Sequence, residues 1–116
     1  MRRVILESPY AGTSADVVER NIEYARACLN DCLQRGEAPI ASHLLYTQPG
    51  VLDDAILKDR QLGIDAGHAW MVGAEVVVMY VDHGVSEGMF IGIRRAKEAG
   101  VPIEWRLLGV LPAVEN

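Results

Sequence analysis

The segment that most constrains the fold of this chain is residues 74–81, in which six apolar residues follow one glutamate without interruption. The segment reads Ala-Glu-Val-Val-Val-Met-Tyr-Val. A continuous apolar run of this length is typical of a strand that is buried on both faces in the middle of a parallel sheet. Parallel strands need helical crossovers, so the rest of the chain is expected to supply helices for both faces of the sheet.

Three further strands are predicted, at residues 3–8, 38–41 and 102–107. In the last of them, apolar residues alternate with Glu104 and Arg106, which is typical of a half-exposed edge strand. Three helices are predicted between the strands, over 14–36, from Asp53 or Asp54 to 73, and over 86–100. Ser14 and Ser86 are the predicted caps of the first and third helices, and each helix ends at a glycine.

Each of the two later helices is expected to bury one stripe of side chains. In the second helix the stripe consists of Leu62, Ala66, Ala69 and Trp70. In the third helix it consists of Met89, Ile93 and Ala96.

The order strand–helix–strand, repeated to a fourth strand, predicts an α/β fold with right-handed crossovers. We expect a three-layer, Rossmann/flavodoxin-like architecture with a four-stranded parallel sheet in the order 2-1-3-4. The chain of 116 residues is long enough for one core, so residues 1–116 are expected to form a single domain.

Composition limits the partners that the chain can have. The net charge of −5 argues against binding to a nucleic-acid backbone. The first apolar run, 4–6, is too short for a signal peptide, and no stretch reaches transmembrane length. We therefore expect a cytoplasmic chain with no membrane partner. Cys28 and Cys32 lie in a helical pattern and are expected to be small buried residues in a reducing compartment, so no metal is expected. The dinucleotide and P-loop glycine motifs do not occur, so no cofactor is expected.

A ligand site is expected beyond the C-terminal ends of the strands, where the strand order reverses between the first and third strands. The loops at that edge are 8–12, 42–48 and 82–88. The third loop leads into a helix, whose free N–H groups favour an anion near Ser86 and Gly88.

The same residues also have ordinary structural interpretations. Ser86 can be a helix cap without binding a ligand, and Asp82 can stabilise the turn before Gly84. Tyr10 can pack on the rim. His43 and His83 both fall on the rim, where hydrogen bonding is a commoner role than a shared metal.

Five motifs in order give the chain a family resemblance. They are Ser-Pro-Tyr-Ala-Gly at 8–12, Ala-Ser-His-Leu-Leu-Tyr at 41–46, Leu-Asp-Asp at 52–54, Asp-His-Gly-Val-Ser-Glu-Gly-Met at 82–89, and the A-x-x-x-G-x-P pattern at 96–102. With these motifs the chain resembles the nucleoside 2-deoxyribosyltransferase superfamily. It is most similar to a small branch that is common in phages and prophages, which implies the host cytoplasm if the chain is phage-encoded.

The resemblance implies cleavage or exchange of the N-glycosidic bond between a base and a sugar. It places Tyr10 against the sugar and Asp82 near the nucleophile and the base. Ser86 falls where nucleoside 5′-monophosphate hydrolases carry a serine for the phosphate, so a monophosphate-type ligand is expected. The remaining candidate ligand-binding residues lie in the same three loops and are Ser8, Gly12, His43, His83, Gly88 and Met89.

The chain departs from the family pattern at Gly92, where the family has its nucleophilic glutamate. Glycosidic chemistry needs a carboxylate at the anomeric carbon, and glycine has none. Glu87 and Glu7 are candidates for a relocated carboxylate. Three hypotheses follow: an N-glycosidase that uses Asp82 with Glu87 or Glu7, a non-catalytic binder that sequesters a nucleotide or nucleotide-derived signal, and an assembly module with a vestigial pocket.

The small sheet and its three loops predict a shallow pocket that a second chain would complete. Apolar residues at 44–46 and 70–72 would then need covering. We therefore expect a homodimer or a higher even-numbered oligomer. The alternative is that Trp70 and its neighbours pack on their own sheet.

Overall fold

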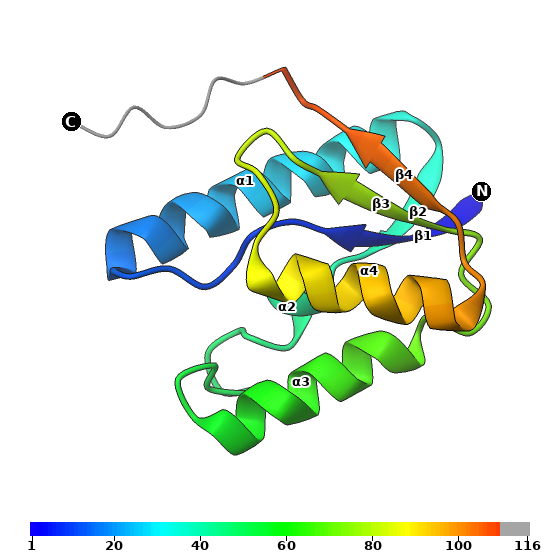
Figure 1. Ribbon diagram of the computed structural model, residues 1–116. Coiled ribbons are helices and arrows are strands. Elements are labelled where there is room, and N and C mark those ends of the chain that lie inside the picture. The colour runs from blue at the N-terminus through cyan, green and yellow to red at the C-terminus, as the bar shows by residue number, and fades with distance from the viewer. Residues whose placement is uncertain (110–116) are drawn as a thin grey trace.

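The computed structural model describes residues 1–109, in which four strands alternate with helices (Figure 1). Their bounds are β1 Arg2–Glu7, α1 Ala15–Gln34, β2 Glu37–Ile40, α2 Ser42–Leu45, α3 Leu57–Ala69, β3 Val76–Tyr80, α4 Glu87–Ala99 and β4 Ile103–Arg106. The four strands form one parallel sheet in the order β2-β1-β3-β4. The predicted α/β fold of Rossmann/flavodoxin type, with its strand order, is confirmed.

Two apolar clusters hold the helices against the two faces of the sheet. On one face, Tyr24, Cys28 and Cys32 of α1 pack on side chains of β1 and β3. On the other face, Met89 and Ala96 of α4 pack on the alternate side chains of the same strands. Figure 1 shows α1 and α4 on opposite sides of the sheet, with α3 lying alongside α4.

The central strand and the helix ends agree with the sequence patterns. All five residues of β3 are buried, as a strand covered on both faces requires. The hydroxyls of Ser14 and Ser86 each accept a hydrogen bond from a backbone N–H in the first turn of their helix, at 3.3 Å. Gly100 ends α4 with a φ of 70°, a left-handed conformation that glycine adopts without strain. Cys28 and Cys32 are buried free thiols.

The buried stripe predicted for the second helix is wrong. Leu62 and Trp70 are 56% and 51% exposed, whereas Gly67 is buried. A methyl group on Gly67 would lie 2.7 Å from the Cβ of Ser42, so α3 approaches α2 through its glycine face rather than through large apolar side chains. This helix begins at Leu57 instead of Asp53 or Asp54, because Asp53 forms a turn by accepting a hydrogen bond from the N–H of Ala55.

In the edge strand β4, a charged residue is buried more deeply than the apolar ones. Arg106 is 5% exposed, while Trp105 is 54% exposed. The guanidinium of Arg106 donates to both carboxylate oxygens of Glu37, at 2.7 and 2.6 Å, and to the hydroxyl of Tyr80. Hydrogen bonds from Arg106 lower the pKa of Glu37 to about 2. A buried bidentate pair of this kind satisfies both charges, so Arg106 is buried while Ile103 still packs against the core.

Two smaller differences concern the segment after the first helix. The second strand runs over Glu37–Ile40, one residue earlier than predicted. Part of the predicted loop at 42–48 is the short helix α2. In residues 1–109, no helix is both long and apolar enough to cross a membrane.

Candidate functional site

A cavity of about 380 Å³ lies beyond the C-terminal end of β1. Its walls come from residues 7–13, from 42–47, from the inner face of α3 and from the start of α4. This volume falls within the range of small-molecule sites, roughly 300–1,000 Å³. A wider groove of about 910 Å³ continues from the cavity along residues 47–55 and shares Tyr10, Arg60 and Glu87 with it. Within residues 1–109, no group of three His, Cys, Asp or Glu side chains is arranged to hold a metal ion.

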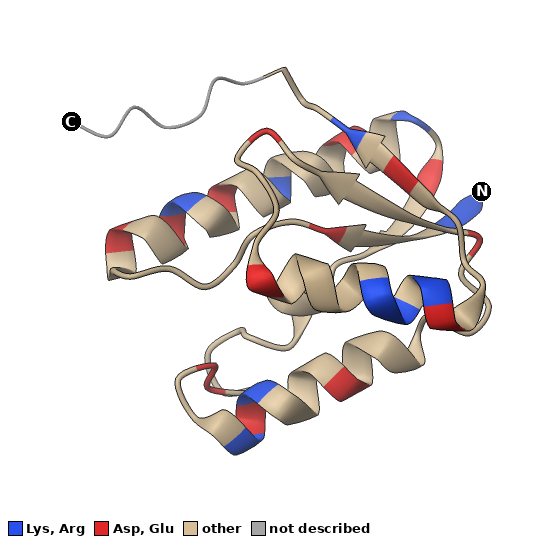
Figure 2. Ribbon diagram, viewed as in Figure 1, with Lys and Arg blue, Asp and Glu red and all other residues tan. Residues whose placement is uncertain are grey.

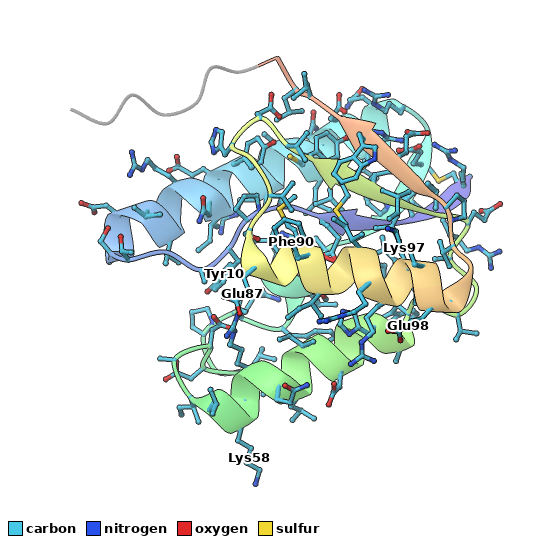
Figure 3. The ribbon with its side chains drawn as sticks, viewed as in Figure 1. Tyr10, Lys58, Glu87, Phe90, Lys97 and Glu98 are labelled. Atoms are coloured by element: carbon cyan, nitrogen blue, oxygen red, sulfur yellow. The ribbon has the colours of Figure 1, made fainter. Side chains whose placement is uncertain are left out.

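The structure brings most of the candidate site residues together. Those that line the cavity are Glu7, Ser8, Tyr10, Gly12, His43, Ser86, Glu87, Gly88 and Met89. Figure 3 shows Tyr10 and Glu87 near the same end of α4. Asp82 and His83 are not among the residues that line it.

The carboxylate of Asp82 instead links the end of β3 to α1 and to residues 108–109. It accepts hydrogen bonds from the hydroxyl of Tyr24 at 2.5 Å and from the N–H groups of Leu108 and Gly109 at 3.0 Å. Burial opposes ionisation, but these hydrogen bonds outweigh it and lower the pKa of Asp82. His83 stacks on the ring of Tyr24, with the ring centroids 4.4 Å apart. The catalytic role expected for Asp82 therefore has no support in this geometry.

Strand periodicity explains the position of Asp82. Successive side chains of a strand point to opposite faces, so Val78, Tyr80 and Asp82 share one side. Val78 and Tyr80 pack in the apolar cluster between α1 and the sheet, the α1 cluster. Asp82 consequently falls on the α1 side of the sheet, where Tyr24 receives it.

Glu7 occupies space that a side chain at Gly92 would need. Glu7 is the last residue of β1, and it lies two positions after Ile5, which packs in the α4 cluster. The three atoms nearest to a methyl group built on Gly92 all belong to Glu7, and its Cδ would be 2.8 Å away. The glycine in α4 therefore makes room for the carboxyl group of β1.

The carboxyl of Glu7 has no hydrogen-bond or ion-pair partner among residues 1–109. Burial raises the pKa of Glu7 to about 8 because the charged form loses its hydration. At neutral pH this group is therefore mainly a neutral acid, which can donate a hydrogen bond or a proton to a ligand.

Ser8 and His43 form a second polar pair on the cavity wall. The Oγ of Ser8 lies 2.6 Å from the Nε2 of His43, and Ser8 is only 4% exposed. Ser8 follows β1 and His43 follows the neighbouring strand β2, so the two meet beyond the strand ends. Burial lowers the pKa of His43 to about 4, and its Nδ1 is buried without a partner in the described part of the chain. The pair is therefore neutral at physiological pH.

At the start of α4, the Ser86 hydroxyl is engaged as a helix cap. It accepts a hydrogen bond from the N–H of Met89 at 3.3 Å. The first N–H groups of a helix have no partner within the helix, so those near Gly88 are available to a ligand. Gly12, in the first loop, packs closely on α1: a methyl group there would lie 2.8 Å from the Cβ of Val17.

The mouth of the cavity contains two charges that the sequence analysis did not single out, those of Asp59 and Arg60. They line it together with Asp54 and Glu87. Figure 2 shows acidic residues before α3, in its first turn and at the start of α4, while basic residues gather toward the far end of α4. Arg60, Ile64 and His68 recur every four residues and all line the cavity. This spacing of four residues is the sequence signal that could have identified the inner face of α3.

These features define a class: an α/β protein with a Rossmann-like parallel sheet and a ligand-sized cavity at the C-terminal edge of that sheet. Residues 2–106 match the model of a family described as a domain of unknown function, DUF7768. Because the match covers most of the chain, the protein belongs to this family. A search of the curated proteins finds no match to the chain.

Proposed function

We propose that the cavity binds a nucleoside 5′-monophosphate and hydrolyses its N-glycosidic bond, with Glu7 as the general acid. One observation carries this proposal: the Glu7 carboxyl fills the space beside Gly92. The resemblance to the 2-deoxyribosyltransferases puts their essential carboxylate at this helix position. A carboxyl group supplied by β1 instead of α4 would act in the same part of the cavity.

Glu7 suits the role of acid because it holds its proton at neutral pH. In the proposed step, Glu7 donates this proton to the leaving nitrogen of the base, and the electron pair of the C1′–N bond goes to the base. Water adds to C1′ and releases its proton to solvent. The products are a free base and a sugar 5′-phosphate, and Glu7 regains its proton from solvent.

Other residues of the cavity would position the substrate. The hydroxyl of Ser8, oriented by His43, is placed to hydrogen-bond a sugar or base. Tyr10, which lines both the cavity and the groove, offers a ring against which the sugar can pack. The start of α4, with Ser86 and Gly88, would face the phosphate.

The test is an assay for released base with a panel of common ribo- and deoxyribonucleoside 5′-monophosphates. The variant Glu7→Gln keeps the shape of the side chain and removes the acid, so turnover should fall by about 10²–10⁴-fold while ligand binding persists. The matched control is Glu98→Gln, an exposed carboxyl at the far end of α4 (Figure 3), which should have no effect. The rate should decrease above about pH 8, where Glu7 loses its proton. Base release that is unaffected by Glu7→Gln contradicts the proposal.

A second candidate is a non-catalytic binder that sequesters a nucleotide. The observation that favours it is the position of Asp82, whose carboxylate is bound inside the protein instead of facing the cavity. For a binder, Glu7 serves only as a hydrogen-bond donor. Tight binding of a monophosphate, no base release across the panel and weaker binding by Glu7→Ala, which removes the donor, would support this function over the enzyme.

A further inference from the structure

Among residues 1–109, Arg60 is the one lysine or arginine that lines the cavity and its groove. It lies in the first turn of α3 and is half-buried. In the part of the chain that the structure describes, its guanidinium has no hydrogen-bond or ion-pair partner. Since Arg60 lines the cavity, its guanidinium is available there to donate hydrogen bonds to an anionic group.

The acidic residues around Arg60 do not neutralise it. Asp59 is held by the loop before α3, because its Oδ2 accepts a hydrogen bond from the N–H of Asp53 at 3.0 Å. Asp54 and Glu87 also line both the cavity and the groove, and no ion pair joins either of them to Arg60 within residues 1–109. The mouth thus offers one unpaired cation among three carboxylates.

We infer that Arg60 binds the phosphate of the ligand and that the surrounding carboxylates restrict the site to a single phosphate. This inference rests on the proposed nucleotide ligand and adds its selectivity. A guanidinium holds a phosphate through two parallel hydrogen bonds, which is a stronger and more directional contact than an ammonium makes. The further phosphates of a di- or triphosphate would face Asp54, Asp59 and Glu87, and like charges repel.

The experiment is calorimetric titration with one nucleoside, its 5′-monophosphate and its 5′-triphosphate, at fixed ionic strength. A charge-assisted contact predicts that the monophosphate binds about 10–100-fold more tightly than the nucleoside. Arg60→Met should remove that difference and leave the affinity for the nucleoside unchanged. Arg60→Lys should keep part of it. The triphosphate should bind more weakly than the monophosphate to the wild-type protein.

Lys58→Met is the matched control, since it removes the same charge from the same helix. Lys58 is exposed and points away from the cavity into solvent (Figure 3). It should leave all three affinities unchanged. The check on folding is the unfolding curve of Arg60→Met, compared with that of the wild-type protein.

Four outcomes would overturn the inference. If Arg60→Met weakens the nucleoside and the monophosphate equally, Arg60 does not read the phosphate. If the triphosphate binds as tightly as the monophosphate, the carboxylates do not limit the site. If monophosphate binding is tight and insensitive to Arg60→Met, only this inference fails. If no nucleoside or nucleotide binds, the proposed function fails with it.

Discussion

The contact between Glu7 and Gly92 predicts that Gly92→Ala destabilises the protein, although alanine normally stabilises a helix. A mid-helix glycine costs about 1 kcal/mol relative to alanine, so the substitution alone should be favourable. In this protein the added methyl group would lie 2.8 Å from Cδ and 3.4 Å from Cγ of Glu7. Glu7 is packed beside α4 and must move to admit it.

The balance of two terms gives the expected magnitude. An overpacking substitution costs about 1–3 kcal/mol, from which the gain in helix propensity of about 1 kcal/mol is subtracted. The net loss of stability for Gly92→Ala should therefore be about 1 kcal/mol. In a Glu7→Ala background the obstructing side chain is gone, so the same substitution should stabilise by up to about 1 kcal/mol. The sign reversal is the specific signature of this contact.

The assay is urea unfolding of the wild-type protein, both single variants and the double variant. The coupling free energy of this cycle should be about 1–3 kcal/mol. Gly88→Ala is the matched control in the same helix, because the nearest atom to its methyl group would be the Oγ of Ser86 at 4.0 Å. It should not be destabilising in either background. Equal effects of Gly92→Ala with and without Glu7 would refute the packing argument.

Two further predictions concern pH and assembly. Burial raises the folded-state pKa of Glu7 to about 8 from an ordinary value of 4.5, so folding takes up a proton and stability is lost as the pH rises between these values. This loss of stability has an upper limit of about 5 kcal/mol. Urea unfolding at several pH values should show that Glu7→Gln abolishes it. An unchanged pH dependence in Glu7→Gln would contradict the prediction. Light scattering should show a homodimer, because Leu57 and Leu62 of α3 are exposed, as is Trp70 directly after it. Trp70→Asp should then shift the mass toward that of one chain, and a wild-type mass of 12.7 kDa would exclude the dimer.

The topology was predictable because its signals are local in the sequence. The apolar run of β3, the serine caps and the terminal glycines each depend on a few neighbouring residues. Once four strands and the crossovers between them are assigned, right-handed connections leave few arrangements of the sheet. The order β2-β1-β3-β4 follows from these constraints without any knowledge of side-chain contacts.

The errors arose where a residue's environment is set by a distant partner. Arg106 is buried because Glu37, 69 positions away, satisfies its charge. Gly67 faces inward because α2 approaches α3 closely at Ser42. Neither partner is visible in a local pattern of apolar and polar residues, so the buried face of β4 and of α3 was predicted from hydrophobicity alone.

The position of the site was more predictable than the orientation of its residues. Parallel topology predicts a cavity at the C-terminal strand ends, and nine of the candidate residues line one there. Asp82 was misplaced because the alternation of β3 was not extended past the end of the strand, where it directs Asp82 toward Tyr24. Arg60 was missed because its neighbours on the inner face of α3 include glycines, which give no apolar stripe.

The distribution of charge in the cavity indicates how the proposed ligand would be oriented. At the end of β1, Glu7 and the Ser8–His43 pair are polar but uncharged at neutral pH, since burial raises one pKa and lowers the other. The charges of the cavity, including Arg60, are instead on α3 and at the start of α4. A nucleotide has the same division, with an uncharged base and sugar at one end and a phosphate at the other. The base and C1′ would therefore lie against Glu7, and the phosphate would lie at the mouth against Arg60, which is the orientation that general acid catalysis by Glu7 requires.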